Sequence, residues 1–136
     1  MLIFVYGTLR RGQGNFERYL ATSRFVGEGT TQGSLLNIGH YPGAIPVTDE
    51  LSAGTMTIIG ELYEVDEKTL QRLDGLEGYR PHLPAQSSLF VRRSVSVTKH
   101  GGEIVLAEMY WWNRSHHDYP IVVGGDWVAY VNQKLS

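Results

Sequence analysis

The chain contains no cysteine among its 136 residues. This absence excludes disulfides, thiolate metal ligands and cysteine nucleophiles together, so packing must stabilise the fold. An excess of positive charge is also lacking: Lys and Arg total 12 against 14 Asp and Glu, and the formal net charge is −2. Because such a balance provides no broad basic surface for a phosphate backbone, we expect no nucleic-acid partner.

Long hydrophobic runs are missing as well. The apolar run at residues 1–6 stops at Gly7 and has no basic leader, so it is too short for a signal peptide or a membrane span. Its β-branched and aromatic residues are typical of a central strand. We therefore expect a cytoplasmic protein with no membrane partner and with a buried first strand.

Motifs for metals, nucleotides and serine nucleophiles are also absent. The five histidines show no His-x-His or His-x-x-x-His spacing, and the adjacent His116 and His117 would face opposite sides of a strand. The sequence has no Gly-x-Ser-x-Gly, no phosphate-loop lysine motif and no dinucleotide fingerprint. We predict no metal site and a reaction that needs no cofactor.

The chain is rich in apolar residues and glycine. It is 42% hydrophobic and 19% charged, with 16 glycines, which is too apolar for a disordered chain. Its length suits one domain over residues 1–136. Strand-like segments dominate and helical segments are few and short. The pattern predicts an α+β fold: a small, mostly antiparallel β-barrel with short flanking helices.

Strands and helices are predicted from hydrophobic periodicity and from capping residues. The expected strands cover residues 2–6, two segments within 25–38, and residues 57–65, 90–98 and 103–112. The last two strands are joined across Gly101 and Gly102, which suit a hairpin. Helices are expected after the N-cap candidates Asn15, Asp66 and Asp126.

The connections are predicted from glycine and proline. Residues 39–55 contain two prolines and several small polar residues, so we expect a long ordered loop there. In the helix after Asp66, Leu70 and Leu73 are the expected buried positions and Gly75 is the expected stop. Glu77 would then lie just beyond the helix.

Two distant stretches hold the candidate chemistry. The turn Tyr6-Gly7-Thr8-Leu9 can present consecutive N–H groups to a carboxylate or to a carbonyl oxygen that gains negative charge. Glu77 lies among glycines and apolar residues, and partial desolvation would raise its pKa toward neutrality and suit it to proton transfer. Without further context, Glu77 is more simply an ordinary loop acid, and the turn a strand end without a ligand.

These stretches belong to an ordered set of segments. Tyr6-Gly7-Thr8-Leu9 is followed by Gly-His-Tyr-Pro-Gly-Ala at 39–44, Gly-Glu-Leu-Tyr-Glu-Val-Asp at 60–66, Leu-Asp-x-x-Glu-Gly at 73–78 and Gly-Asp-Trp at 125–127. In content and order the set resembles the γ-glutamylcyclotransferase-like family, over most of the chain. The resemblance implies a compact β-barrel with flanking helices.

The resemblance also implies a reaction and roles for two segments. Glu77 matches the family's catalytic acid/base, and the turn from Tyr6 to Leu9 matches its substrate-binding loop. The implied reaction releases 5-oxoproline from a small-molecule γ-glutamyl amide by intramolecular aminolysis. Arg10 could add charge beside the turn, although a surface salt bridge explains it equally well.

Five further residues are candidates for secondary roles. Glu61 either points into a barrel cavity, as a second acid or a ligand contact, or faces solvent. Asp74 is expected to cap backbone donors. The Tyr110 hydroxyl could reach a ligand, although packing is the commoner role for such an aromatic. Phe90 stands where many relatives have a tyrosine, two places before an arginine, here Arg92.

Two other kinds of function fit the same residues. A binding or regulatory module could retain the family pocket without efficient turnover, because fold alone does not define function. A protein-interaction domain using Trp111, Trp112 and Trp127 has less support, since aromatics at strand positions are usually core. The residues do not identify the leaving group or the oligomeric state.

Overall fold

The computed structural model describes residues 1–47 and 56–135. In chain order its elements are β1 (Leu2–Val5), α1 (Phe16–Tyr19), β2 (Arg24–Gln32), β3 (Ser34–Asn37), β4 (Pro42–Ile45), β5 (Thr57–Glu64), α2 (Glu67–Glu77), a short 3₁₀ helix (Ala85–Ser87), β6 (Phe90–Lys99), β7 (Ile104–Trp112) and α3 (Trp127–Leu135).

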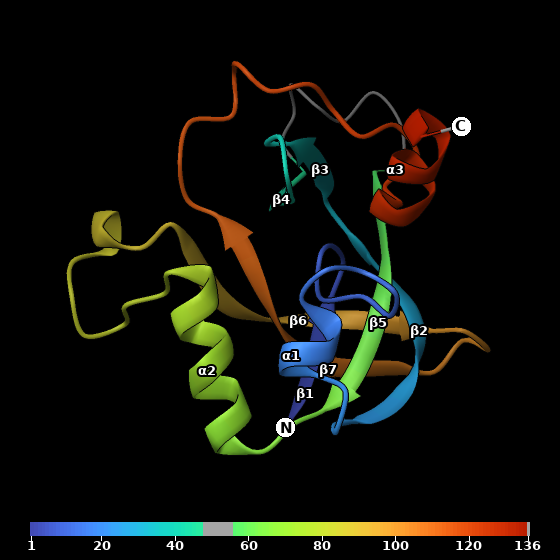
Figure 1. The fold of residues 1–136 in the computed structure, drawn as a ribbon, viewed down its shortest axis with the longest axis vertical. Coiled ribbons are helices and arrows are strands. Elements are labelled where there is room, and N and C mark those ends of the chain that lie inside the picture. Colours follow the sequence, from blue (N-terminus) through green and yellow to red (C-terminus); the bar gives the residue numbers. More distant parts are fainter. Residues whose placement is uncertain (48–55, 136) are drawn as a thin grey trace.

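Five of these strands form a closed barrel in the order β1, β5, β2, β6, β7. All neighbours are antiparallel except β1 and β7, which close the barrel in parallel through Ile3 and Glu108. Helix α2 lies along one side, while α3 and the separate hairpin of β3 and β4 lie at one end (Figure 1). The predicted α+β barrel with short flanking helices is confirmed.

The hairpin of β6 and β7 also matches its prediction. Pairing runs from Phe90 opposite Trp112 to Thr98 opposite Ile104. Gly101 and Gly102 in the connection have φ values of 110° and 105°, a region that glycine enters without steric cost. Alternating apolar side chains and a glycine turn were sufficient signals for this pair.

Helix α2 begins where predicted but ends later. The Asp66 side chain accepts a hydrogen bond from the Thr69 amide at 2.7 Å, and Leu70 is buried. The expected stop at Gly75 is wrong: the helix continues to Glu77 and ends at Gly78, where φ is 67°. Because glycine inside an exposed helix costs only about 1 kcal/mol, the turn's packing outweighs that preference.

The loop expected over residues 39–55 is partly a strand. Pro42–Ile45 forms β4, which pairs with β3 from Asn37 opposite Pro42 to Ser34 opposite Ile45. Proline is tolerated here because it begins a strand of a two-stranded sheet. Residues 39–41 and 46–47 lie outside any helix or strand, as expected, and residues 48–55 lie outside the described residues.

Two clusters of buried apolar side chains pack against the barrel. Trp112 and Trp127 belong to these clusters, with 8% and 4% of their surface exposed, which contradicts a shared tryptophan interaction surface. No helix in residues 1–47 and 56–135 is long and apolar enough to cross a membrane.

Candidate active site

A pocket of about 300 Å³ lies where β1 ends, between α2 and β4. The two stretches singled out in the sequence meet in it, although about seventy residues separate them. It is lined by residues 4–9, Asn15, residues 40–42, Leu76, Glu77, Leu89, Phe90 and Tyr110. No lysine or arginine is among these described lining residues. Apart from His40, the pocket therefore offers an anion only uncharged donors.

The turn after β1 uses its carbonyl groups internally and leaves its amides available. The carbonyl of Gly7 accepts the Arg10 N–H at 3.0 Å, and that of Thr8 accepts the Asn15 N–H at 2.9 Å. In the part of the chain that the structure describes, the amides of Gly7, Thr8 and Leu9 have no acceptor. Consecutive unpaired N–H groups of this kind are typical of the backbone nests that bind anions.

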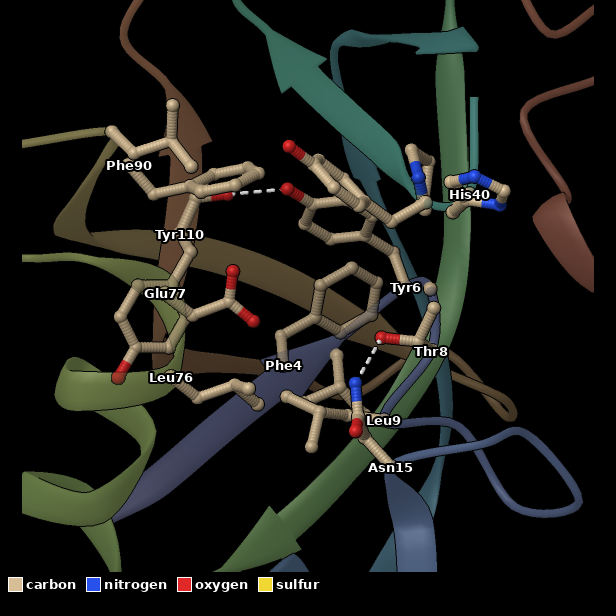
Figure 2. A pocket seen from close by; sticks show the side chains of 15 residues that line it. Phe4, Tyr6, Thr8, Leu9, Asn15, His40, Leu76, Glu77, Phe90 and Tyr110 are labelled. Carbon is tan, nitrogen blue, oxygen red and sulfur yellow. Dashed lines mark hydrogen bonds between the residues drawn. The ribbon is translucent and has the colours of Figure 1, made fainter. Parts of the chain in front are cut away.

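Side chains hold the shape of this turn. Asn15 donates from Nδ2 to Thr8 Oγ1 at 2.9 Å, a contact visible in Figure 2. A Cβ on Gly7 would lie 2.6 Å from Pro42 Cγ, so the close approach of the turn to β4 requires glycine. Asn15 was predicted only as a helix cap, and its side chain instead braces the turn.

Glu77 projects from the last turn of α2 into the pocket (Figure 2). Among the described residues no hydrogen-bond donor or cation contacts its carboxylate. Burial raises the pKa of Glu77 from 4.5 to about 7, because the charged form loses water without gaining a partner. A carboxylate with a pKa near 7 can both accept and donate a proton at neutral pH.

A charged network ties the helix turn before Glu77 to the barrel. Arg92 donates to both carboxylate oxygens of Asp74, from Nε at 2.9 Å and from Nη2 at 3.3 Å. The Tyr110 hydroxyl donates to the same carboxylate at 2.6 Å, and Arg92 also pairs with Glu108. The expectation that Asp74 caps backbone donors is therefore wrong: its carboxylate joins α2 to β6 and β7.

This network also determines the direction of the Tyr110 hydroxyl. Its ring lines the pocket, while its hydroxyl is directed at Asp74 rather than at the pocket space. Burial and the bond to Asp74 raise the pKa of Tyr110 above its usual value. Arg92 likewise does not line the pocket. Since Asp74 lies one helical turn before Glu77, the network positions the candidate acid/base.

Tyr110→Phe is expected to lower the free energy of unfolding by about 1–2 kcal/mol, because a hydrogen bond to a charged acceptor is lost while the Arg92 pair remains. Urea unfolding would measure this change. The effect on turnover should be modest, since the ring is retained. A Phe variant as stable as the parent would show that the hydroxyl adds nothing to the network.

Arg10 and Glu61 form a buried pair outside the pocket. Each residue is 7% exposed, and Arg10 Nε lies 3.1 Å from Glu61 Oε2. Glu61 also accepts from the Arg11 amide and the Tyr63 hydroxyl, and Arg10 reaches Asp126 at 2.8 Å. Both alternatives for Glu61, a pocket acid or a solvent-facing side chain, are contradicted. The pair anchors the end of the turn to β5 and to the start of α3.

Tyr6 lines the pocket through its ring, and its hydroxyl is internally satisfied. It donates to the Tyr110 carbonyl at 2.7 Å and accepts from the Ala44 amide at 3.2 Å. Sequence reasoning did not select the wall formed by His40 and Tyr41, although both belong to the recognised segment at residues 39–44. Phe90 packs at the wall without a hydroxyl.

The fold and this site define a class: a small barrel that presents free backbone amides opposite a lone desolvated carboxylate. The family model for γ-glutamyl cyclotransferase, AIG2-like, matches residues 3–129. The chain belongs to this family.

Individual relatives agree with that assignment. The γ-glutamylcyclotransferase family protein YtfP of Escherichia coli K12 is 32% identical over 94% of this chain and 96% of its own length. The γ-L-glutamyl-butirosin B γ-glutamyl cyclotransferase of Niallia circulans is 35% identical over 98% of this chain and 80% of its own. The crystal structure of an AIG2-like protein from Mus musculus superimposes with a TM-score of 0.68 at 28% identity, covering 88% of this chain and 83% of that one. The similarity supports a cyclotransferase-like enzyme acting on a γ-glutamyl compound.

Proposed function

We propose that this protein converts a γ-glutamyl amide into 5-oxoproline and a free amine, with Glu77 as the single general acid/base. The observation that carries the proposal is the pairing, within one pocket, of an unpartnered carboxylate with three unpaired amides. No other described side chain that lines the pocket carries a carboxylate. The proposal needs no protein nucleophile, in keeping with a chain that lacks cysteine.

The proposed reaction is an internal transfer of an acyl group. The substrate's α-carboxylate, or the oxygen of its scissile carbonyl, rests on the amides of Gly7, Thr8 and Leu9. Glu77 takes a proton from the α-ammonium, and the freed amine attacks its own γ-carbonyl to close a five-membered ring. Glu77 then returns this proton to the departing nitrogen as the old C–N bond breaks, and the ring nitrogen loses its remaining extra proton to solvent, which leaves a neutral lactam N–H and a free amine. No water is consumed, and one carboxylate serves both halves.

In this scheme the protein has to supply only part of the reduction in the activation barrier. Well-oriented intramolecular attack supplies roughly 7–11 kcal/mol of the barrier reduction. Proton transfer by a positioned side chain contributes about 10²- to 10⁴-fold more. The site must therefore hold the glutamyl chain folded, bind the developing negative charge and exchange one proton. The pocket has groups for each task.

The pKa of Glu77 predicts a pH profile for the reaction. Below about pH 7 the carboxyl is protonated and cannot accept the ammonium proton, so kcat/KM should fall about tenfold per pH unit on the acid side. Initial rates between pH 5 and 8 would measure this limb. A flat profile through pH 6 would contradict the assignment of Glu77.

Unfolding does not explain such an acid limb. Because the folded state binds the Glu77 proton more tightly than the unfolded chain, this group's stabilising contribution is fully present below pH 4.5 and is lost as pH rises through about 7. The acid-side loss of rate therefore opposes the stability trend that Glu77 contributes. Thermal unfolding at pH 6 and 8 provides the control.

The direct test is incubation of the protein with a panel of γ-glutamyl amino acids and γ-glutamylamines, with detection of 5-oxoproline. Release of 5-oxoproline from at least one member, in proportion to enzyme concentration, is the expected result. Saturable binding of panel members without any product would instead support a binding or regulatory module that retains the pocket.

A further inference from the structure

A second hollow, of about 260 Å³, adjoins the pocket on the side of α3. The two spaces share Thr8 and His40 as lining residues, and Figure 2 shows both on the side of the pocket opposite Glu77. The other residues that line it are Gln13, Asn37, Gly39, Trp127, Tyr130 and Val131. The two spaces are therefore neighbours that meet at Thr8 and His40.

The wall contributed by α3 is aromatic and apolar. The rings of Trp127 and Tyr130 are stacked, with centroids 5.7 Å apart and planes at 24°. Val131 follows on the same helix. Trp127 is buried, with 4% of its surface exposed, while Tyr130 and Val131 are half-buried. Such a surface favours a flat or branched apolar group over a small or strongly hydrated one.

The polar residues of the hollow add little charge. Asn37 donates to the Tyr130 hydroxyl at 3.0 Å and accepts from the Gly39 amide at 2.9 Å, so its amide is already engaged. No carboxylate, lysine or arginine is among the described residues that line the hollow. A cationic chain placed there would lose water without meeting an anion.

We propose that this hollow, which we call the α3 hollow, receives the side chain of the leaving amine. The preferred substrates are then γ-glutamyl amino acids whose second residue is aromatic or branched aliphatic. The proposal rests on the proposed function, because it places the glutamyl group beside Glu77 and Thr8. Burial of such a side chain should raise kcat/KM about tenfold to a hundredfold over γ-glutamyl-alanine.

The test compares γ-glutamyl-phenylalanine, γ-glutamyl-leucine, γ-glutamyl-alanine and γ-glutamyl-putrescine as substrates. The wild type should favour the first two at least tenfold over the last two. Val131→Trp fills the α3 hollow and should remove most of this preference. Ala129→Trp places the same bulk at an exposed position of the same helix and should leave all four rates unchanged.

The outcomes separate the two proposals. Product from no substrate overturns the proposed function and this inference with it. Equal turnover of the alanine and phenylalanine substrates overturns the role of the α3 hollow alone, as does a Val131→Trp variant with the wild-type preference. If Val131→Trp does not fold, Val131→Ala supplies the test: widening the hollow should lower the phenylalanine-to-alanine ratio at least threefold, and an unchanged ratio counts against the proposal.

Discussion

Glu77→Gln is expected to lower 5-oxoproline release by about 10²- to 10⁴-fold while leaving the fold intact. Glutamine has nearly the same shape as glutamate but cannot accept the ammonium proton or return it to the leaving nitrogen. The substitution also removes a carboxylate that is costly to bury in its charged form, so stability at pH 8 should not decrease. Rates of 5-oxoproline release and thermal unfolding at pH 8 would measure both effects.

Glu67→Gln is the matched control for this substitution. Glu67 lies in the first turn of the same helix and is exposed, far from the pocket lining. Its substitution should leave turnover within twofold of the wild type. If Glu77→Gln kept turnover within tenfold of the wild type, Glu77 would have no part in proton transfer.

Gly125→Ala is expected to have the largest effect on stability, a loss of 4 kcal/mol or more. A Cβ at this position would overlap the backbone carbonyl oxygen of Thr57, and neither backbone segment can move freely because the Ile59 amide donates to the Gly125 carbonyl at 2.9 Å. Gly125 also has a φ of 67°, which disfavours any side chain. Losses of this size are rare and diagnostic of a specific clash. Urea unfolding would measure the loss.

A substitution at the neighbouring Gly124 distinguishes the cost of backbone strain from the cost of steric overlap. Gly124 has a φ of 90°, yet a Cβ there would meet nothing within 4 Å. Gly124→Ala should therefore cost only the backbone term, about 1–2 kcal/mol. Equal losses for the two variants would mean that the approach of residue 125 to β5 contributes nothing.

Gly125 matters for the site because it places the start of α3. The next residue, Asp126, pairs with Arg10 and accepts a hydrogen bond from the Ala129 amide at 3.1 Å, as expected for an N-cap. Trp127 then forms part of the α3 hollow. A shift of this segment would alter both the end of the turn from Tyr6 to Leu9 and the proposed subsite.

Local patterns predicted the parts of the fold whose causes are local. Alternation with two turn glycines predicted the hairpin of β6 and β7, and a capping aspartate predicted the start of α2. The predicted end of α2 was wrong because two glycines lie three residues apart, and only packing selects Gly78 over Gly75 as the stop. Periodicity likewise could not reveal β4, which is short and exists through its pairing with β3.

The candidate site likewise has a part that the sequence predicted and a part that it did not. Glu77 and the turn from Tyr6 to Leu9 were selected from residue type, neighbours and family resemblance, all properties that a linear chain displays. The partners of Asp74 and Glu61 were not predictable, because Arg92 and Arg10 lie 18 and 51 residues away and ion pairs carry no periodic signal.

Composition and order along the chain were enough to determine the family, the barrel class and the two segments that carry the candidate chemistry. Tertiary structure alone decided that these segments meet in one pocket, that Glu77 loses its water there without gaining a partner, and that α3 adds a second hollow beside Thr8. The physical reason is that desolvation and enclosure depend on which distant elements pack together, and barrel closure determines that packing.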